Sequence, residues 1–283
     1  MTDQLTLLQQ VPLERYKPRL YLNGFPKAGL HLLEQMMQVL VSPSQVGQSG
    51  NEWLGTFKHR SWTNEPKDLR RFLWRLSCLR HGQYAKGHCG YWDEIERLMW
   101  YANIGQVFVY RDLRDVAVSV AHHVTSDDPQ LAHEHKSFFQ MMEFDDVLMA
   151  VIEGIGPYPG VIERWERYAP WLEVDWVLRV KYEELVADLE LWAENILHYA
   201  VSNATRLLET RIAPMAITLD TEREIVKRMI EAARDTGKST TYRKGQPGEW
   251  RETFKPEHVK AFKKADQAGW LKRLGYEESK RDW

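Results

Sequence analysis

The segment from Asn23 to Gly29, NGFPKAG, combines two glycines, a proline and a lysine between an apolar run and a helical pattern. Leu20–Leu22 predicts a short buried strand, and apolar residues at helical spacing follow Gly29. A turn between a strand and a helix directs backbone N–H groups at an anion, and Lys27 adds a positive charge. We therefore expect a phosphate-like group here, although glycine and proline before a helix are also ordinary turn chemistry.

This segment differs from the phosphate loop of ATP-binding proteins. In that loop a lysine directly follows the second glycine, and the next residue is a serine or threonine that binds magnesium. Here Lys27 precedes Gly29, and Leu30 and His31 follow it. A hydroxyl ligand for magnesium is missing.

A second segment, RDLRDVAVS, places Arg111 after the apolar run 106–110 and Ser119 eight residues further on. If a helix begins near Leu113, Ser119 lies about two turns into it. Arg111 is suited to bidentate binding of a phosphate. A local ion pair between Arg111 and Asp112 is the competing interpretation.

Two further segments carry residues of chemical interest. Lys86-Gly87-His88 follows a predicted strand, and a histidine there is a candidate general base, although a single histidine is more often structural. Cys89 is a poor candidate nucleophile because adjacent side chains diverge and no Asn or Asp partner is indicated. Arg243-Lys244-Gly245 lies in a predicted loop, where it would either bind an anion or form a solvated basic turn.

The elements that must position these residues alternate between strand and helix. This order predicts an α/β fold with three layers, in which a mostly parallel sheet lies between helices. Ligands of such sheets bind at the carboxyl ends of the strands. The residues that directly follow predicted strands are Lys27, His88, Arg111 and Tyr182.

Several predicted boundaries depend on apolar spacing alone. The pattern predicts one continuous helix over 138–152, a loop over 154–160, a strand over 174–180 and a helix over 183–199.

The long polar stretch 42–66 is expected to be a functional loop. The loops also carry aromatic residues that either belong to the core or line a ligand pocket: Trp53, Trp62, Tyr91, Trp92, Phe138 and Tyr158.

Composition limits the class of protein. The chain has 283 residues, 43% of them hydrophobic, and a net charge of −2. This charge favours neither nucleic acid nor an anionic membrane as a partner. Two cysteines build neither a disulfide framework nor a four-cysteine zinc site. Without a secretory signal or an apolar run of ~20 residues, the chain is expected to be cytoplasmic and to form one domain over 1–283, with a leader over 1–18.

Five motifs, in order across roughly residues 20 to 275, together resemble the sulfotransferase family. FPKAG is similar to its 5′-phosphosulfate loop, and VFVYRDLRDVAVS to its 3′-phosphate motif. Lys86-Gly87-His88 resembles the family's Lys-Thr-His, and Tyr182-Glu183-Glu184 its Tyr-Glu-Asp. TYRKGQPGEWRETF resembles its C-terminal Arg-Lys-Gly block. The region that resembles the family extends over 19–278.

The resemblance implies a P-loop-type fold and sulfuryl transfer from 3′-phosphoadenosine 5′-phosphosulfate (PAPS) to a hydroxyl or amine of a small molecule. The product is 3′,5′-adenosine bisphosphate (PAP), and no metal is implied. His88 would be the base, with Lys27 and Lys86 as further catalytic residues. The donor would be bound by Lys27, Ala28, Gly29, Leu30, His31, Arg111, Ser119, Tyr182, Arg243, Lys244 and Gly245.

The sequence also departs from the family pattern. Ala28, Leu30 and His31 stand where hydroxyl residues usually donate to phosphate, and we expect His31 to substitute as a donor. The family's dimer motif is altered at Lys255-Pro256 and Lys260, so the chain is expected to be a monomer or a homodimer. These departures suggest a specialised member, for example one that modifies a natural product.

Two other functions remain open from the sequence. One is a P-loop small-molecule kinase, which the missing Ser or Thr after Gly29 disfavours. The other is a non-catalytic nucleotide-binding scaffold, which the altered Ala28–His31 favours and the presence of Lys27, His88 and Arg111 disfavours.

Overall fold

The computed structural model describes residues 17–43, 66–128, 135–206, 219–235 and 245–278. Among them, no helix is long and apolar enough to span a bilayer.

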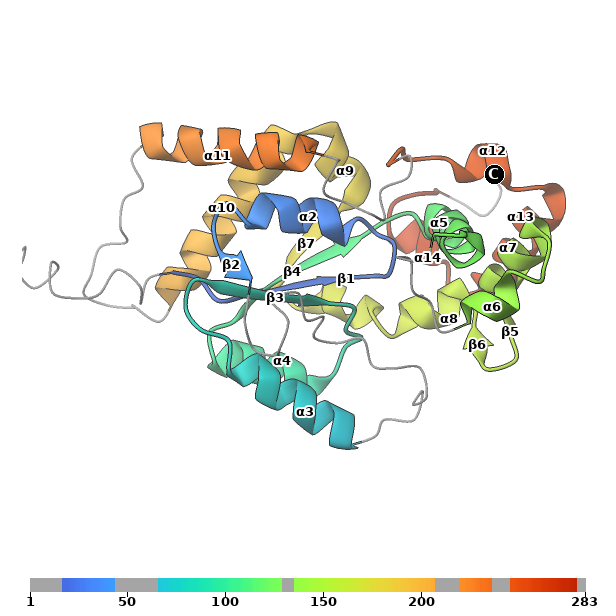
Figure 1. The fold of residues 1–283 in the computed structure, drawn as a ribbon, viewed down its shortest axis with the longest axis horizontal. Helices are drawn as coiled ribbons and strands as arrows, with labels where there is room; N and C mark the ends of the chain where they lie inside the picture. The colour runs from blue at the N-terminus through green and yellow to red at the C-terminus, as the bar shows by residue number, and fades with distance from the viewer. Residues whose placement is uncertain (1–16, 44–65, 129–134, 207–218, 236–244, 279–283) are drawn as a thin grey trace, which may run out of the picture.

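The centre of the molecule is a five-stranded parallel sheet with the strand order β2-β3-β1-β4-β7. The predicted parallel sheet is therefore confirmed. The central strand β1 pairs with β3 on one side and with β4 on the other (Figure 1). The strands are β1 (Leu20–Gly24), β2 (Ser42–Pro43), β3 (Gln83–Gly87), β4 (Gly105–Tyr110) and β7 (Leu178–Lys181).

Helices cover both faces of the sheet because alternate residues of each strand point to opposite faces. Leu20 and Leu22 of β1 belong to one buried cluster, whereas Tyr21 belongs to another. Helices α2 (Leu30–Met37), α10 (Leu189–Thr205) and α11 (Leu219–Arg234) lie on the first face. On the opposite face lie α3 (Pro66–Ser77) and α4 (Asp93–Tyr101) (Figure 1).

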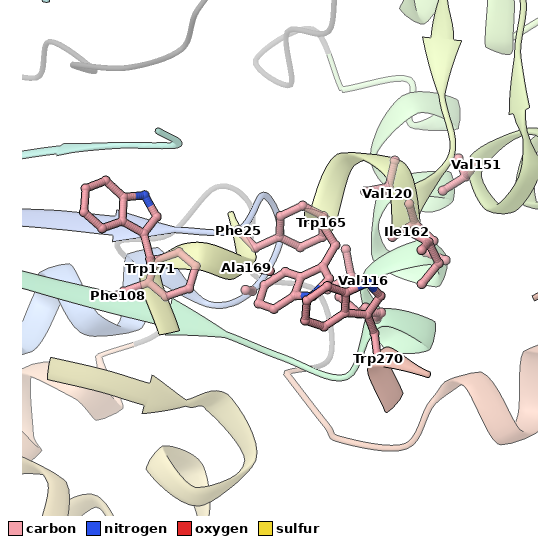
Figure 2. Close-up of a cluster of buried hydrophobic side chains, with 14 of the residues drawn as sticks. Phe25, Phe108, Val116, Val120, Val151, Ile162, Trp165, Ala169, Trp171 and Trp270 are labelled. Atoms are coloured by element: carbon pink, nitrogen blue, oxygen red, sulfur yellow. The ribbon is translucent and has the colours of Figure 1, made fainter. Parts of the chain in front are cut away.

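A group of short helices lies beyond the carboxyl ends of β1 and β4 (Figure 1). Aromatic side chains join this group to the sheet (Figure 2). Trp165 packs edge-on against Phe25 at 5.4 Å between ring centroids and against Trp270 at 6.1 Å. The group comprises α5 (Leu113–Thr125), α6 (Lys136–Phe139), α7 (Phe144–Glu153), α8 (Val161–Glu166), α12 (Trp250–Thr253), α13 (Pro256–Ala265) and α14 (Trp270–Arg273).

Two predicted boundaries in this group are wrong. The helix expected over 138–152 is two helices, α6 and α7, because Glu143 leaves the helical conformation at ψ 150°. The loop expected over 154–160 contains a two-stranded antiparallel ladder between β5 (Gly154–Ile155) and β6 (Tyr158–Pro159).

The C-terminal part of the sheet also differs from the prediction. The strand expected over 174–180 begins only at Leu178, because a turn bond from the Val177 N–H to the Val174 carbonyl precedes it. The helix expected over 183–199 is divided into α9 (Tyr182–Ala187) and α10 at Asp188. Asp188 has φ −141° and ψ 83°, and its side chain accepts a bond from the Leu191 N–H.

Candidate active site

The turn between β1 and α2 forms a tight loop over the end of the sheet. The Phe25 N–H donates to the Val109 carbonyl of β4 at 3.1 Å, and the Ala28 N–H donates to the Phe25 carbonyl at 3.0 Å. Lys27 has a φ of 68°, in the left-handed region that residues with a side chain rarely occupy. Such strain persists where the surrounding structure enforces it, often at ligand sites.

Gly29 precedes α2 and leaves no room for a side chain. Its φ is 99°, and an added Cβ would lie 2.3 Å from Cδ2 of Tyr182. Tyr182 begins α9 directly after β7, and its hydroxyl donates to the Gly245 carbonyl at 2.9 Å. The Tyr182 ring therefore joins the loop after β1 to the C-terminal segment.

His88 follows β3 and lies against the end of β1. Its Nδ1 is 2.7 Å from the Gly24 carbonyl oxygen. A carbonyl oxygen only accepts hydrogen bonds, so Nδ1 carries the hydrogen and the neutral ring keeps its lone pair on Nε2. Burial lowers the pKa of His88 to about 4; the bond to Gly24 opposes this shift, and the charges of His31, Lys27 and Lys86 add to it. His88 is therefore a neutral imidazole at pH 7, as a general base must be.

Asn23 fixes the position of His88, and the sequence analysis missed this residue. The fully buried side chain donates from Nδ2 to the Cys89 carbonyl at 2.9 Å. Its Oδ1 accepts from the Cys89 N–H at 2.8 Å and from the Gly24 N–H at 3.0 Å. One amide thus joins the ends of β1 and β3. Cys89 itself is buried, which raises the pKa of its thiol well above the usual range and disfavours a nucleophilic role.

Lys86 contacts a carboxylate that the sequence analysis also missed. Its Nζ lies 2.7 and 2.8 Å from the two carboxylate oxygens of Glu34 in α2. Tyr84 donates to the same carboxylate at 2.8 Å, and His31 Nδ1 lies 3.6 Å from it. Burial would raise the pKa of Glu34, but the hydrogen bonds from His31, Lys86 and Tyr84 lower it to about 2. The pair holds β3 and α2 together beside His88.

Arg111 lies at the carboxyl end of β4 and is buried. Its Nη2 donates to Asp115 Oδ2 at 3.2 Å and to the Gln246 carbonyl at 2.7 Å, and its guanidinium lies 4.7 Å from the Tyr182 ring centroid. The competing pair with Asp112 does not form in the described residues. The Nε of Arg111 is buried and has no hydrogen-bond partner there. This donor is therefore available to an anion.

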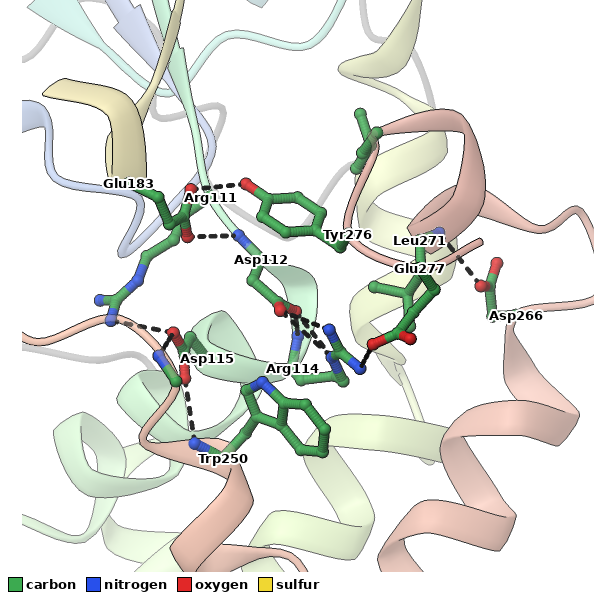
Figure 3. A network of polar contacts seen from close by, with 12 residues as sticks. Arg111, Asp112, Arg114, Asp115, Glu183, Trp250, Asp266, Leu271, Tyr276 and Glu277 are labelled. Carbon is green, nitrogen blue, oxygen red and sulfur yellow. Dashed lines mark hydrogen bonds and ion pairs between the residues drawn. The ribbon is translucent and has the colours of Figure 1, made fainter. Parts of the chain in front are cut away.

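A polar network fixes the surroundings of Arg111 (Figure 3). The Asp115 carboxylate accepts from the N–H groups of Gly248 and Trp250 at 2.7 and 3.0 Å. Asp112 accepts from Arg114 at 2.7 Å, and Arg114 also pairs with Glu277. The end of β4 is thereby attached to the C-terminal segment.

Glu183 extends this network to α9. Its carboxylate accepts from the Asp112 N–H at 3.1 Å and from the Tyr276 hydroxyl at 2.7 Å (Figure 3). Burial raises the pKa of Glu183, and these bonds counteract the rise. Glu183 thus joins three segments of the chain next to Tyr182.

The predicted site residues within the described part converge on one edge of the sheet. Ser119 is half-buried in α5, two turns after its first residue, as the spacing predicts. Gly245 has a φ of 63° and lies against Tyr182. The predicted residues Arg243 and Lys244, and the aromatic candidates Trp53 and Trp62, lie outside the described residues. Those on the edge are Lys27, Ala28, Gly29, Leu30, His31, Lys86, His88, Arg111, Tyr182 and Gly245.

Some of the aromatic residues that were candidates for lining a ligand pocket are exposed, and others are buried. Phe138 is 43% exposed, whereas Tyr158 is buried and Tyr91 packs against Trp171. In the described ranges, no three His, Cys, Asp or Glu side chains are arranged to hold a metal ion.

Comparisons with known proteins identify relatives in fold and a family. Mouse sulfotransferase SULT7A1 complexed with PAP has a TM-score of 0.53 and 15% identity, with 93% of this chain and 87% of that chain covered. Retinol dehydratase in complex with androsterone and inactive cofactor PAP has a TM-score of 0.50 and 14% identity, with 94% and 85% covered. No curated protein matches the sequence at a significant level. The model of the sulfotransferase domain matches residues 17–275, and the chain belongs to the sulfotransferase family.

Proposed function

We propose that the protein transfers a sulfuryl group from PAPS to a hydroxyl or amine of a small-molecule acceptor, with His88 as the general base. The observation that carries this proposal is the 2.7 Å contact between His88 Nδ1 and the Gly24 carbonyl. This contact holds a neutral base beside Gly24, where the loop between β1 and α2 begins. We call this loop, residues 24–29, the anion loop. A base in this position meets an acceptor hydroxyl next to the group that is transferred.

The residues at the carboxyl edge of the sheet fit PAPS, the proposed sulfuryl donor. Two solved relatives in fold are complexes with PAP. Gly29 lets the loop after β1 pack directly against the Tyr182 ring, and Arg111 keeps a buried donor without a partner among the described residues. The 5′ group is bound by the main chain of Lys27, Ala28, Gly29, Leu30 and His31, and the 3′-phosphate by Arg111, Ser119, Arg243, Lys244 and Gly245, with Tyr182 beside the nucleotide.

Each catalytic residue has a distinct task. PAPS supplies an activated sulfuryl group, whose transfer requires positioning and charge stabilisation more than covalent chemistry from the protein. The Lys27 ammonium stabilises the negative charge that develops on the leaving phosphate. His88 Nε2 takes the acceptor proton. Lys86 keeps the Glu34 carboxylate paired, and its charge contributes to the lowered pKa of His88.

The acceptor, the cellular location and the assembly remain predictions. The altered loop Ala28–His31 suggests a specialised acceptor such as a natural product. We expect the reaction in the cytoplasm, and a monomer or a homodimer as the active form.

An acceptor panel tests the proposal. The protein is mixed with PAPS and with phenols, aliphatic alcohols and amines, and PAP release is measured together with the mass of the product. Acceptor-dependent PAP release with a sulfated product supports the proposal. Phosphorylated products with ATP and magnesium would support the small-molecule kinase instead, and nucleotide binding without any transfer would support the scaffold.

A further inference from the structure

Arg164 in α8 is a buried arginine that the proposed mechanism does not use. Its side chain is 6% exposed. Nη1 donates to the Tyr158 hydroxyl at 2.9 Å, and the guanidinium carbon lies 4.9 Å from the Tyr158 ring centroid. Nε and Nη2 are buried and have no hydrogen-bond partner in the described part of the chain. Two strong donors of one charged group are thus left unsatisfied.

The other two buried arginines show what Arg164 lacks. Arg111 pairs with Asp115, and Arg114 pairs with Asp112 and Glu277. No carboxylate of the described residues pairs with Arg164. Burying a charge without a counter-ion is costly, and a water molecule would satisfy the hydrogen bonds but not the charge. This arrangement favours an anion that arrives with a ligand.

The two unsatisfied nitrogens also specify the shape of the anion. Nε and Nη2 form one edge of the planar guanidinium, and their N–H groups point in parallel. This edge matches the two oxygens of a carboxylate. The Tyr158 hydroxyl occupies Nη1 and holds the plane in place.

Arg164 is connected to His88 through the turn that follows α8. Tyr168 lies in this turn, and its N–H donates to the Trp165 carbonyl at 2.8 Å. The Tyr168 hydroxyl donates to the His88 carbonyl at 3.2 Å. Burial raises the pKa of Tyr168, and the nearby charge of Arg164 counteracts part of this rise. The neighbouring Trp165 packs on Phe25 of the anion loop (Figure 2).

We propose that Arg164 binds a carboxylate of the acceptor, so that the substrate is a small hydroxy or amino acid and not a neutral alcohol. This inference rests on the proposed sulfotransferase function and names its acceptor class. The donor does not compete for Arg164, because its phosphates are assigned to the loop after β1 and to Arg111. The acceptor carboxylate completes the ion pair that the chain leaves open.

Binding of paired probes tests the inference. 4-Hydroxybenzoate, 4-hydroxyphenylacetate and 3-(4-hydroxyphenyl)propionate are each compared with the neutral amide by calorimetry, with and without saturating PAP. We expect at least one acid to bind tenfold or more tightly than its amide. Arg164→Met is expected to remove this preference. Arg167→Met is the matched control and is expected to keep it, because Arg167 lies three residues further along the chain and is exposed.

Thermal unfolding separates a binding role from a structural one. If Arg164 binds a ligand, Arg164→Met leaves the Tm unchanged or raises it, because an unpaired buried charge is removed. Arg164→Lys keeps the charge without the planar edge and is expected to bind the acid with intermediate affinity. Equal binding of acids and amides by the wild type, or an acid preference that survives in Arg164→Met, would overturn the inference. If the wild-type protein does not bind PAP, that result would instead overturn the assignment of the donor.

Discussion

The imidazole of His88 acquires its properties from its surroundings. The Gly24 carbonyl fixes the tautomer, and burial together with nearby positive charges keeps the ring neutral. The Asn23 amide bonds the main chain of the two neighbouring residues, Gly24 and Cys89, and so joins the ends of β1 and β3. At this scale the proposed site consists of a neutral imidazole next to the loop that carries Lys27.

Replacing His88 tests its role as the base. His88→Ala is expected to lower turnover by about 10²–10⁴-fold, the usual contribution of a general base, and to change PAP affinity less than about threefold. His198→Ala is the matched control, because that side chain is exposed and pairs only with Glu222 in the described residues. Steady-state rates and calorimetry measure the two effects. Turnover that survives in His88→Ala would remove this residue from the mechanism.

The pH dependence provides a second test of His88. Its pKa is lowered to about 4, so the active neutral form predominates above that pH. The acid limb of kcat/KM should have its midpoint near pH 4, with no loss between about pH 6 and 8 from this group. Folding follows the same sign: the unfolded chain binds the proton more tightly, so stability falls as pH decreases from about 6.5 toward 4. A midpoint near 6.5 would contradict the burial of this base.

At the scale of elements, the site depends on where strands end and helices begin. The loop after β1 contacts β4 through Phe25 and α9 through Gly29. The end of β4 is attached to the C-terminal segment through Asp115. Four separate segments therefore hold the predicted donor residues.

Gly29 is a position where this packing leaves no room for an added side chain. Gly29→Ala is expected to destabilise the fold by about 1–3 kcal/mol and to weaken PAP binding at least tenfold, because the methyl group meets the Tyr182 ring at a positive φ. Gly156→Ala is the control: its φ of 54° is also positive, but nothing lies within 4 Å of the added Cβ. Urea unfolding and calorimetry measure both variants. Equal effects of the two substitutions would show that contact with Tyr182 is unimportant.

The elements differ in how well the sequence predicts them, for physical reasons. β1 and β4 contain apolar runs that lead into turns, so their pattern is clear, whereas β3 includes Gln83 and Lys86 and has a weaker pattern. The break between α6 and α7 is hidden because Met141 continues the apolar spacing although it is 80% exposed. The break at Asp188 carries a signal that was available, since aspartate is a common helix cap.

The site was partly predictable for a related reason. Lys27, His88 and Arg111 follow strands, and parallel strands bring their carboxyl ends to one edge. Asn23 was missed because the apolar run ends at Leu22 and the sequence pattern assigns Asn23 to the turn, although it belongs to β1. Glu34 was missed because a carboxylate on an amphipathic helix is usually solvated. Their roles depend on contacts between segments that lie far apart in the sequence.

At the scale of the whole molecule, charge is arranged locally. The net charge is only −2, so no overall field attracts a polyanionic nucleotide. The cations proposed to bind the donor lie at one edge of the sheet, with Lys27 on the loop after β1 and Arg111 at the end of β4. Selectivity for a nucleotide with a 3′-phosphate must therefore come from this edge.

Calorimetric titration with PAP, and in parallel with ATP and ADP, without magnesium, tests the central claim most directly. If the edge binds PAPS, PAP should bind with micromolar affinity and at least tenfold more tightly than ATP, because only PAP carries the 3′-phosphate that Arg111 and Ser119 are proposed to hold. ATP that binds as tightly as PAP, or more tightly, would contradict the assignment of the donor.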